Sequence, residues 1–311
     1  AKNERLLVVR TAMDCACTLH ADTIKTRTDH TVNNFILILL QINYFCLIRF
    51  IISMHQINFT PLNDYFDHIY VISLLRDTIR QEKIKTELKG LHFEFLYGAD
   101  LQLDTVEKYI ELGLYDEDLA VKNHRRKKRI TKGMLGCTIS HRMVYEDVVK
   151  NGYKKVLIFE DDVVPIADHI PYFTPIMEQL PQDWDLVYFD YNKNTKRSFF
   201  NRIKQNWYHV QKRIAGLTHT HTALNNLYAK QYSTHLKLAG YHDFADAYAI
   251  TLSAAEQLLI LQTPIVYWSD HLLAFCCANK ILKGFISLPK LFYQESASPA
   301  FATTSYTAEK K

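Results

Sequence analysis

The sequence predicts an α/β fold in which helices pack against a mainly parallel central sheet. Strand-type and helix-type segments alternate from about residue 65 onward, which is typical of sheets whose strands are joined by helical connections. Of the 311 residues, 48% are hydrophobic and 13% are aromatic, so the chain can bury a sizeable core. This composition excludes a disordered chain, a collagen-like chain and a disulfide-stapled mini-protein.

Five segments have the β-branched and aromatic composition of strands. They are residues 68–74, 92–97, 155–159, 185–190 and 245–251. The third of them (KVLIF) is apolar after its first residue, which predicts a strand buried on both faces.

Helical spacing and boundary residues mark the segments between the strands. The expected helices cover residues 77–89, 104–112, 131–152, 171–180, 256–262 and 272–278. Thr131 and Ser253 have the side chains and positions of N-caps for the third and fifth helices. Residues 192–240 are less regular, and we expect them to form an insertion with loops.

The first 53 residues differ in character from the rest. Residues 35–53 form an apolar run that Gln41, Asn43 and Arg49 interrupt, and a spanning helix needs about 20 mostly apolar residues. Three interpretations stay open: translated sequence upstream of a start at Met54, a membrane-associated segment, and a structural helix. We therefore divide the chain into this atypical segment (1–53), a globular domain (54–296) and a polar tail (297–311).

The formal net charge of +4 is unevenly distributed. Residues 122–132 hold seven Lys or Arg and no acid, which leaves the rest of the globular domain mildly acidic. This distribution argues against a nucleic-acid partner. Two interpretations of the basic strip stay open, a solvated loop and peripheral contact with an anionic membrane or phosphorylated acceptor. The centre of the basic strip is Arg125, Arg126, Lys127, Lys128 and Arg129.

The strongest local feature is an acidic triplet, Glu160, Asp161 and Asp162, directly after the strand 155–159. Strand ends in open α/β sheets face the ligand crevice. Carboxylates there suit Mg²⁺ or Mn²⁺, particularly when a substrate diphosphate completes the coordination. We predict that the triplet holds a divalent metal with Asp162 as the direct ligand, and the alternative is a solvated turn.

A second motif precedes the triplet by about 20 residues: GMLGCTISHRMVY over residues 133–145. Together with the strand end FEDDV, it resembles glycosyltransferase family 25, the lipooligosaccharide-biosynthesis galactosyltransferases and their collagen galactosyltransferase relatives. Residues 70–74, 95–100, 183–188 and 246–253 resemble further elements of that family. The resemblance therefore spans roughly residues 66–294.

The resemblance implies a GT-A fold, a nucleotide-sugar-binding α/β sandwich, for the domain 54–296. It implies inverting transfer of a hexose, with galactose from UDP-galactose as first choice, to a lipooligosaccharide core saccharide, with Mn²⁺ or Mg²⁺ as cofactor. It also implies a cytoplasmic enzyme, and peripheral attachment to the inner face of the bacterial inner membrane stays open. The alternatives are a transferase for another UDP-hexose and a catalytically silent carbohydrate-binding or adhesion relative.

Such a reaction needs a carboxylate base for the acceptor hydroxyl. Asp270 resembles a family acidic position and is the first choice, with Asp190 and Asp246 as competitors. The resemblance and the affinity of guanidinium for phosphate indicate donor-binding residues elsewhere. These are Ser73, Arg76, Asp100, Ser140, His141 and Arg142, with Arg80 as a further diphosphate ligand. Candidates for stacking on acceptor sugars are Tyr191, Trp207, Tyr208, Tyr241 and Trp268.

Overall fold

The computed structural model describes residues 57–124, 127–215 and 217–297. They belong to one compact unit that begins at Ile57. The predictions for residues 1–53, for Arg125 and Arg126, and for the tail beyond residue 297 fall outside these ranges. No helix within the described ranges combines the length and apolarity needed to cross a bilayer.

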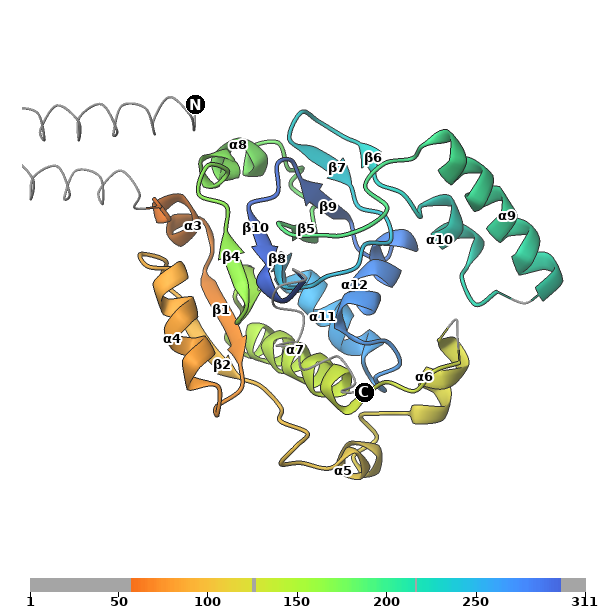
Figure 1. The fold of residues 1–311 in the computed structure, drawn as a ribbon, viewed down its shortest axis with the longest axis horizontal. Coiled ribbons are helices and arrows are strands. Elements are labelled where there is room, and N and C mark those ends of the chain that lie inside the picture. Colours follow the sequence, from red (N-terminus) through yellow and green to blue (C-terminus); the bar gives the residue numbers. More distant parts are fainter. Residues whose placement is uncertain (1–56, 125–126, 216, 298–311) are drawn as a thin grey trace, which may run out of the picture. The chain divides into compact units, whose positions relative to one another are not determined.

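An eight-stranded sheet forms the centre of the described unit (Figure 1). Strands β8 and β7 run against the other six. In spatial order the strands are β2 (Glu94–Tyr97), β1 (His68–Ser73), β3 (Lys155–Glu160), β8 (Ala247–Thr251), β5 (Leu186–Tyr188), β9 (Gly284–Ser287), β7 (Leu236–Leu238) and β6 (Lys230–Gln231). A separate pair joins β10 (Phe292–Gln294) to β4 (Val163–Pro165) in antiparallel fashion.

Helices cover both faces of the sheet. One layer is formed by α3 (Thr60–Tyr65), α4 (Thr78–Glu87) and α8 (Phe173–Met177) with η1 (Ile170–Tyr172), and the other by α7 (Lys132–Asn151), α11 (Leu252–Leu261) and α12 (Ser269–Ala278). The remaining elements are α5 (Val106–Glu111), α6 (Glu117–Asn123), α9 (Phe199–Ala215), α10 (His221–Asn225) and η2 (Glu295–Ala297).

Alternation along the central strands creates the two cores. In β3, Leu157 and Phe159 face the layer of α4 and α8, whereas Val156 and Ile158 face α7 and α11, as the two-residue repeat of a strand requires. All four side chains are fully buried, and each large one contributes about 1.5–3 kcal/mol relative to its exposed state.

The structure confirms the α/β class and the five predicted strands. It also places a helix in each of the six segments where one was expected. Thr131 caps α7, accepting a hydrogen bond from the Met134 amide at 3.2 Å. The predicted cap at Ser253 is wrong, because α11 begins at Leu252 and the Thr251 hydroxyl accepts from the Ala254 amide.

The expectation of a loop-rich insertion over residues 192–240 is also wrong in part. Helix α9 occupies 17 of these residues, and α10, β6 and β7 follow it. The many charged and amide side chains of α9 obscured the three- and four-residue spacing of its apolar residues.

The strand directions bring the candidate site residues to one edge of the sheet. The parallel strands β1, β3 and β5 end there, near Ser73, Glu160 and Asp190, and the antiparallel strand β8 begins there after Asp246. The fold therefore gathers residues that are more than a hundred positions apart at the carboxyl edge of the sheet, where open α/β sheets bind ligands.

Candidate active site

A cavity of about 330 Å³ opens at this edge, between the ends of β1 and β3 and the first turns of α7. The cationic side chains Arg76, Arg80 and Lys132 line it together with the acidic triplet. We call it the first cavity. Its mixture of guanidinium groups and carboxylates suits a ligand that is anionic and metal-bridged.

A second cavity of about 360 Å³ adjoins the first. Phe244, Trp268 and Asp270 line it, so it combines aromatic surface with one carboxylate. Phe244 has φ +79°, an unusual backbone conformation for a bulky residue. The residues common to both cavities are Cys137, Glu160, Gln294 and Ser296.

The three carboxylates of the triplet have different surroundings. The two oxygens of Asp161 are occupied, Oδ1 by an ion pair with Arg80 and Oδ2 by the Ser73 hydroxyl at 2.6 Å. Burial raises the pKa of Asp161 to about 6, although Arg80 and Ser73 oppose the shift. Asp162 has one oxygen 3.7 Å from Arg80, while its buried Oδ1 has no hydrogen-bond partner within the described residues.

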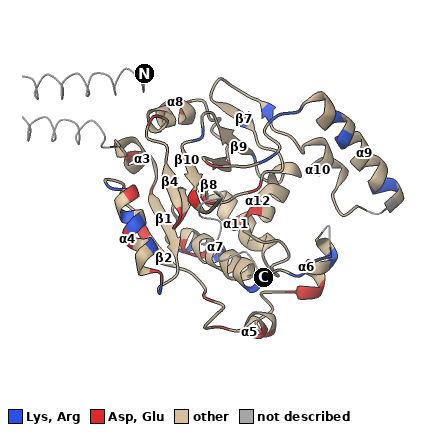
Figure 2. Cartoon of the chain, in the orientation of Figure 1, with Lys and Arg blue, Asp and Glu red and all other residues tan. Residues whose placement is uncertain are grey.

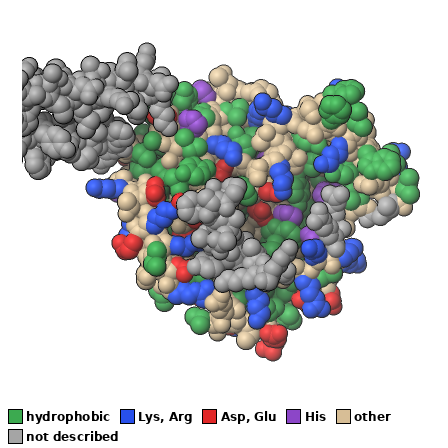
Figure 3. All heavy atoms as spheres, viewed as in Figure 1, with side chains coloured by type: hydrophobic (Ala, Val, Ile, Leu, Met, Phe, Trp, Pro, Cys, Tyr) green, Lys and Arg blue, Asp and Glu red, His purple; other side chains and the backbone are tan. Residues whose placement is uncertain are grey.

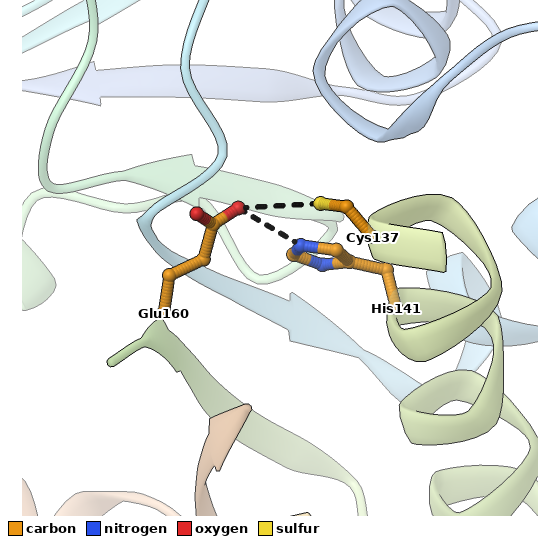
Figure 4. A group of neighbouring side chains, drawn as sticks. All are labelled: Cys137, His141 and Glu160. Atoms are coloured by element: carbon orange, nitrogen blue, oxygen red, sulfur yellow. Dashed lines mark hydrogen bonds and ion pairs between the residues drawn. The ribbon is translucent and has the colours of Figure 1, made fainter. Parts of the chain in front are cut away.

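Glu160 is held by a relay of polar groups that reaches it from α7 and β8, and Figure 4 shows the two members that contact it, His141 and Cys137 of α7. The Tyr145 and Tyr248 hydroxyls lie 2.8 Å apart, Tyr248 lies 2.7 Å from His141 Nδ1, and His141 Nε2 lies 3.3 Å from Glu160 Oε1. Cys137 Sγ lies 3.6 Å from the same oxygen. Burial opposes ionisation of Glu160, but His141, Cys137 and Arg80 outweigh it and lower the pKa of its carboxyl.

One direction of donation satisfies the whole relay. Burial raises the pKa of Tyr145 and of Tyr248 far above neutrality, so each hydroxyl keeps its single proton. If Tyr145 donates to Tyr248 and Tyr248 to Nδ1 of His141, the Nε2–H then donates to Glu160 and every group has a partner. The relay thus fixes the tautomer of His141 and the orientation of Glu160.

Replacing Tyr248 by Phe is expected to lower the free energy of unfolding by about 1–3 kcal/mol, since it leaves a fully buried imidazole nitrogen unpaired. Denaturant titration measures this loss. The matched control is Tyr145→Phe, which removes only the outer donor and should cost less. A larger loss for Tyr145→Phe than for Tyr248→Phe would contradict the direction of donation.

The predicted donor-binding residues separate into two groups. Ser73, Arg76, Asp100, Ser140 and His141 all line the first cavity. Arg76 pairs with Asp100 there, while Ser140 accepts from the Ala99 amide at 3.0 Å and so ties α7 to the turn after β2. Arg142 is not brought to this cavity: it donates to the Leu259 and Gln262 carbonyls and fixes the end of α11.

The three candidates for the base also separate. Asp190 accepts from Lys290 at 2.7 Å and from two backbone amides, and Asp246 is buried beside it. Burial, and after it the charge of the neighbouring Asp190, raise the pKa of Asp246 well above its usual range. Neither residue is among those that line the first or the second cavity, whereas Asp270 lines the second.

Asp270 stands in the first turn of α12, where its oxygens accept from the His271 amide at 2.8 Å and the Phe244 amide at 3.4 Å. Those bonds favour the ionised form. Burial and the charge of Asp243 outweigh them and raise the pKa of Asp270 to about 7. A carboxylate with this pKa can take up a proton near neutral pH, as a general base must.

Of the five candidates for sugar stacking, only Trp268 lines a described cavity. Tyr191 is buried and donates to the Ser287 carbonyl. Trp207 is exposed on α9.

Comparison with known families identifies the family of the domain in which these cavities lie. A family model described as "Glycosyltransferase family 25 (LPS biosynthesis protein)" matches residues 66–273, about two thirds of the chain. The chain belongs to glycosyltransferase family 25. The resemblance inferred from the 133–145 motif and the acidic triplet is thereby confirmed, and the match contains β1, β3, α7 and Asp270.

Named relatives are between 25% and 31% identical to this family 25 chain over the stretches that align. "Inactive glycosyltransferase 25 family member 3" of Homo sapiens is 28% identical over 205 residues, which are 63% of this chain and 29% of that protein. "Glycosyltransferase 25 family member" of Aedes aegypti is 31% identical over 131 residues, 39% of this chain and 21% of that protein. "Procollagen galactosyltransferase 2" of Homo sapiens is 25% identical over 135 residues, 40% of this chain and 20% of that protein. The chain thus spans less than a third of the length of these relatives.

Among solved structures, mouse xyloside xylosyltransferase 1 in its apo form has a TM-score of 0.28 at 9% identity, over 70% of this chain and 76% of that one. This similarity is too low to bear on the fold of the family 25 chain.

The residues of this family 25 site fit a hard divalent cation. The buried Oδ1 of Asp162 has no hydrogen-bond partner among the described residues. Burial and the charge of Glu160 raise the pKa of Asp162, although the Ser296 and Gln294 side chains and Arg80 oppose the shift. An oxygen such as Oδ1 accepts a cation readily. Asp161 fits less well because Arg80 and Ser73 occupy its oxygens.

A softer arrangement also exists in the described residues, because ligand atoms of Cys137, His141 and Glu160 lie within 4.8 Å of one another. Thiol and imidazole ligands suit zinc rather than magnesium. Burial raises the pKa of the Cys137 thiol, so Cys137 acts as a donor to Glu160 unless a metal displaces its proton.

Sequence reasoning missed four contributors to this family 25 site: Cys137, Tyr145, Tyr248 and Phe244. Cys137 and Tyr145 stand within the 133–145 motif, four residues before and after His141. That spacing placed them on the same helix face as His141, and it was the signal available in the sequence. Phe244 left no such signal, because its position depends on a hydrogen bond that its backbone amide donates to the Asp270 carboxylate.

Proposed function

We propose that this chain is an inverting, divalent-cation-dependent glycosyltransferase that moves a hexose from a UDP-sugar to a saccharide hydroxyl. UDP-galactose is the first-choice donor and a lipooligosaccharide core the first-choice acceptor, at the cytoplasmic face of a membrane. The observation that carries the proposal is the meeting of two unlike cavities at Glu160. The side chains that line the first cavity suit a diphosphate, and those that line the second suit a sugar beside a carboxylate base.

The first cavity supports the assignment of the donor. Arg76, Arg80 and Lys132 offer cationic groups to phosphate oxygens, and guanidinium matches phosphate geometry in bidentate fashion. A cation held by Asp162 and Glu160 would neutralise negative charge on the departing diphosphate.

The second cavity supports the assignment of the acceptor. Trp268 and Phe244 provide flat apolar surface for a sugar ring. The Asp270 carboxylate accepts the hydroxyl proton as the acceptor oxygen bonds to the anomeric carbon. The bond from that carbon to the diphosphate oxygen breaks on the opposite face, UDP leaves, and the configuration inverts. Arg80, beside Asp161 and Asp162, is placed to stabilise the leaving charge.

The test is UDP release from a panel of UDP-hexoses, with Mn²⁺, with Mg²⁺ and with a chelator. We expect release with one preferred donor, stimulation by acceptor saccharide and loss of release with chelator. Release that is unaffected by chelator would contradict the cation dependence, and a preferred donor other than UDP-galactose would replace the first choice.

The second candidate is a catalytically silent binding relative, favoured by the word "inactive" in the names of several relatives. Asp162, Glu160 and Asp270 stand around the joined cavities of this chain in ionisable form, which supports the enzyme. Retained binding of glycan without UDP release from any donor would establish the silent alternative.

A further inference from the structure

Helix α9 presents its apolar side chains to solvent. Six of them, between 41% and 82% exposed, follow a three- and four-residue spacing. At about 100° per residue they fall within an arc of about 100° on one face of the helix. They are Phe199, Phe200, Ile203, Trp207, Val210 and Ile214.

The opposite, polar face of α9 is the one that packs on the protein. Gln205 is buried and donates to the Leu224 carbonyl of α10, and His209 Nδ1 lies 3.2 Å from His221 Nδ1. A helix that only covered a core would have the reverse arrangement, with apolar residues inward. The outward apolar face therefore requires a partner of its own.

The charge around this face identifies the partner's chemistry. Residues 191–242, which include α9, contain nine Lys or Arg and no Asp or Glu. In Figure 2 the ribbon of α9 has blue Lys and Arg positions and no red Asp or Glu position. On the helix surface, Arg202 and Arg213 border one side of the apolar arc and Lys204 borders the other. In Figure 3 apolar side chains gather at the end of the view where α9 lies, beside Lys and Arg.

We propose that α9 lies in the interface of an anionic lipid bilayer, with its aromatic and aliphatic face inserted among the acyl chains. An interfacial helix has these three features: a strong apolar face, flanking Lys and Arg, and aromatic residues at the polar boundary. The flanking cations extend to the anionic headgroups while their methylene stems cover apolar surface. This surface lies on α9, a different segment of the sequence from the basic strip at 125–129, and its test measures binding rather than transfer.

The test uses the full chain with vesicles of phosphatidylcholine alone or with about one third phosphatidylglycerol. We expect anionic vesicles to bind at least tenfold more strongly, and Phe200→Ser with Trp207→Ser to lower that binding at least tenfold. The matched control is Ile79→Ser with Leu103→Ser, which removes two equally exposed apolar side chains elsewhere and should leave binding unchanged. Neutralising residues 125–129 separates the contribution of the basic strip.

The fluorescence of Trp207 reports whether α9 itself enters the bilayer. It therefore distinguishes insertion of α9 from vesicle binding by residues 1–53. The Trp207 fluorescence should shift to shorter wavelength on anionic vesicles and be quenched by brominated lipid, and Trp207→Phe should abolish both changes. Unchanged Trp207 emission on vesicles that hold the protein would overturn the proposal. A dimer in sedimentation experiments that the double variant Phe200→Ser with Trp207→Ser converts to monomer would also overturn it, because the partner of α9 would then be a second copy of the chain.

Discussion

Replacement of Asp162 by Asn is expected to lower sugar transfer about 10³-fold while leaving the fold intact. Asn keeps the size of the side chain but removes the carboxylate charge. Asp162 has the one triplet oxygen that is buried without a hydrogen-bond partner among the described residues. A cation at the diphosphate supplies several kcal/mol of charge stabilisation, and each 1.36 kcal/mol is a factor of ten in rate. UDP release at rising Mn²⁺ concentration, together with calorimetric titration of Mn²⁺ into the protein, measures the effect.

Two matched variants make this prediction specific. Asp161→Asn should cost far less in rate, about tenfold, because the oxygens of Asp161 already serve Arg80 and Ser73. Cys137→Ser should leave Mn²⁺ dependence in place, since sulfur is not a ligand of a hard cation. If Asp161→Asn were the more damaging variant, or if Cys137→Ser abolished cation binding, the cation would belong to a different set of side chains.

The central strands and the acidic triplet were predictable because their environments are extreme. Strand β3 is buried on both faces, so its apolar run predicts a buried strand without knowledge of the neighbouring strands. The charged residue that follows it, Glu160, is not explained by packing in the core. The same reasoning could not show that β8 runs antiparallel between β3 and β5. Its pairing depends on contacts far apart in sequence, and the strand's own residues suit either direction.

The sequence could not show which of the three candidate carboxylates lines a cavity. Asp190, Asp246 and Asp270 are alike as sequence features, and only the packing distinguishes them. Lys290 and two amides hold Asp190, and Asp246 is buried beside it. Of the three, Asp270 is the one that lines either of the two cavities described above. Arg142 shows the same limit: it adjoins His141 in sequence, yet the helical turn directs it to α11.

Replacement of Asp270 by Asn is expected to lower transfer about 10²–10⁴-fold, the usual contribution of a general base. With a pKa of about 7, Asp270 is protonated below neutral pH, so the wild-type rate should fall about tenfold per pH unit below about pH 7. Because its folded-state pKa lies above the unfolded value, ionisation of Asp270 lowers the free energy of unfolding as pH rises from the ordinary carboxyl range to about 7, and the loss is constant above that. At pH 8 the Asn variant should therefore be more stable, by up to about 4 kcal/mol at 1.36 kcal/mol per pKa unit, although its transfer rate is lower.

Opposite signs for stability and rate distinguish a base from a structural carboxylate, since loss of a purely structural group lowers both. Asp243 supplies the control: its charge helps to raise the pKa of Asp270, and it lines neither cavity. Asp243→Asn should move the acid limb of the rate profile to lower pH while keeping the rate at pH 8. An acid limb that stays in place in Asp243→Asn, or a full rate in Asp270→Asn, would assign the proton transfer to another group.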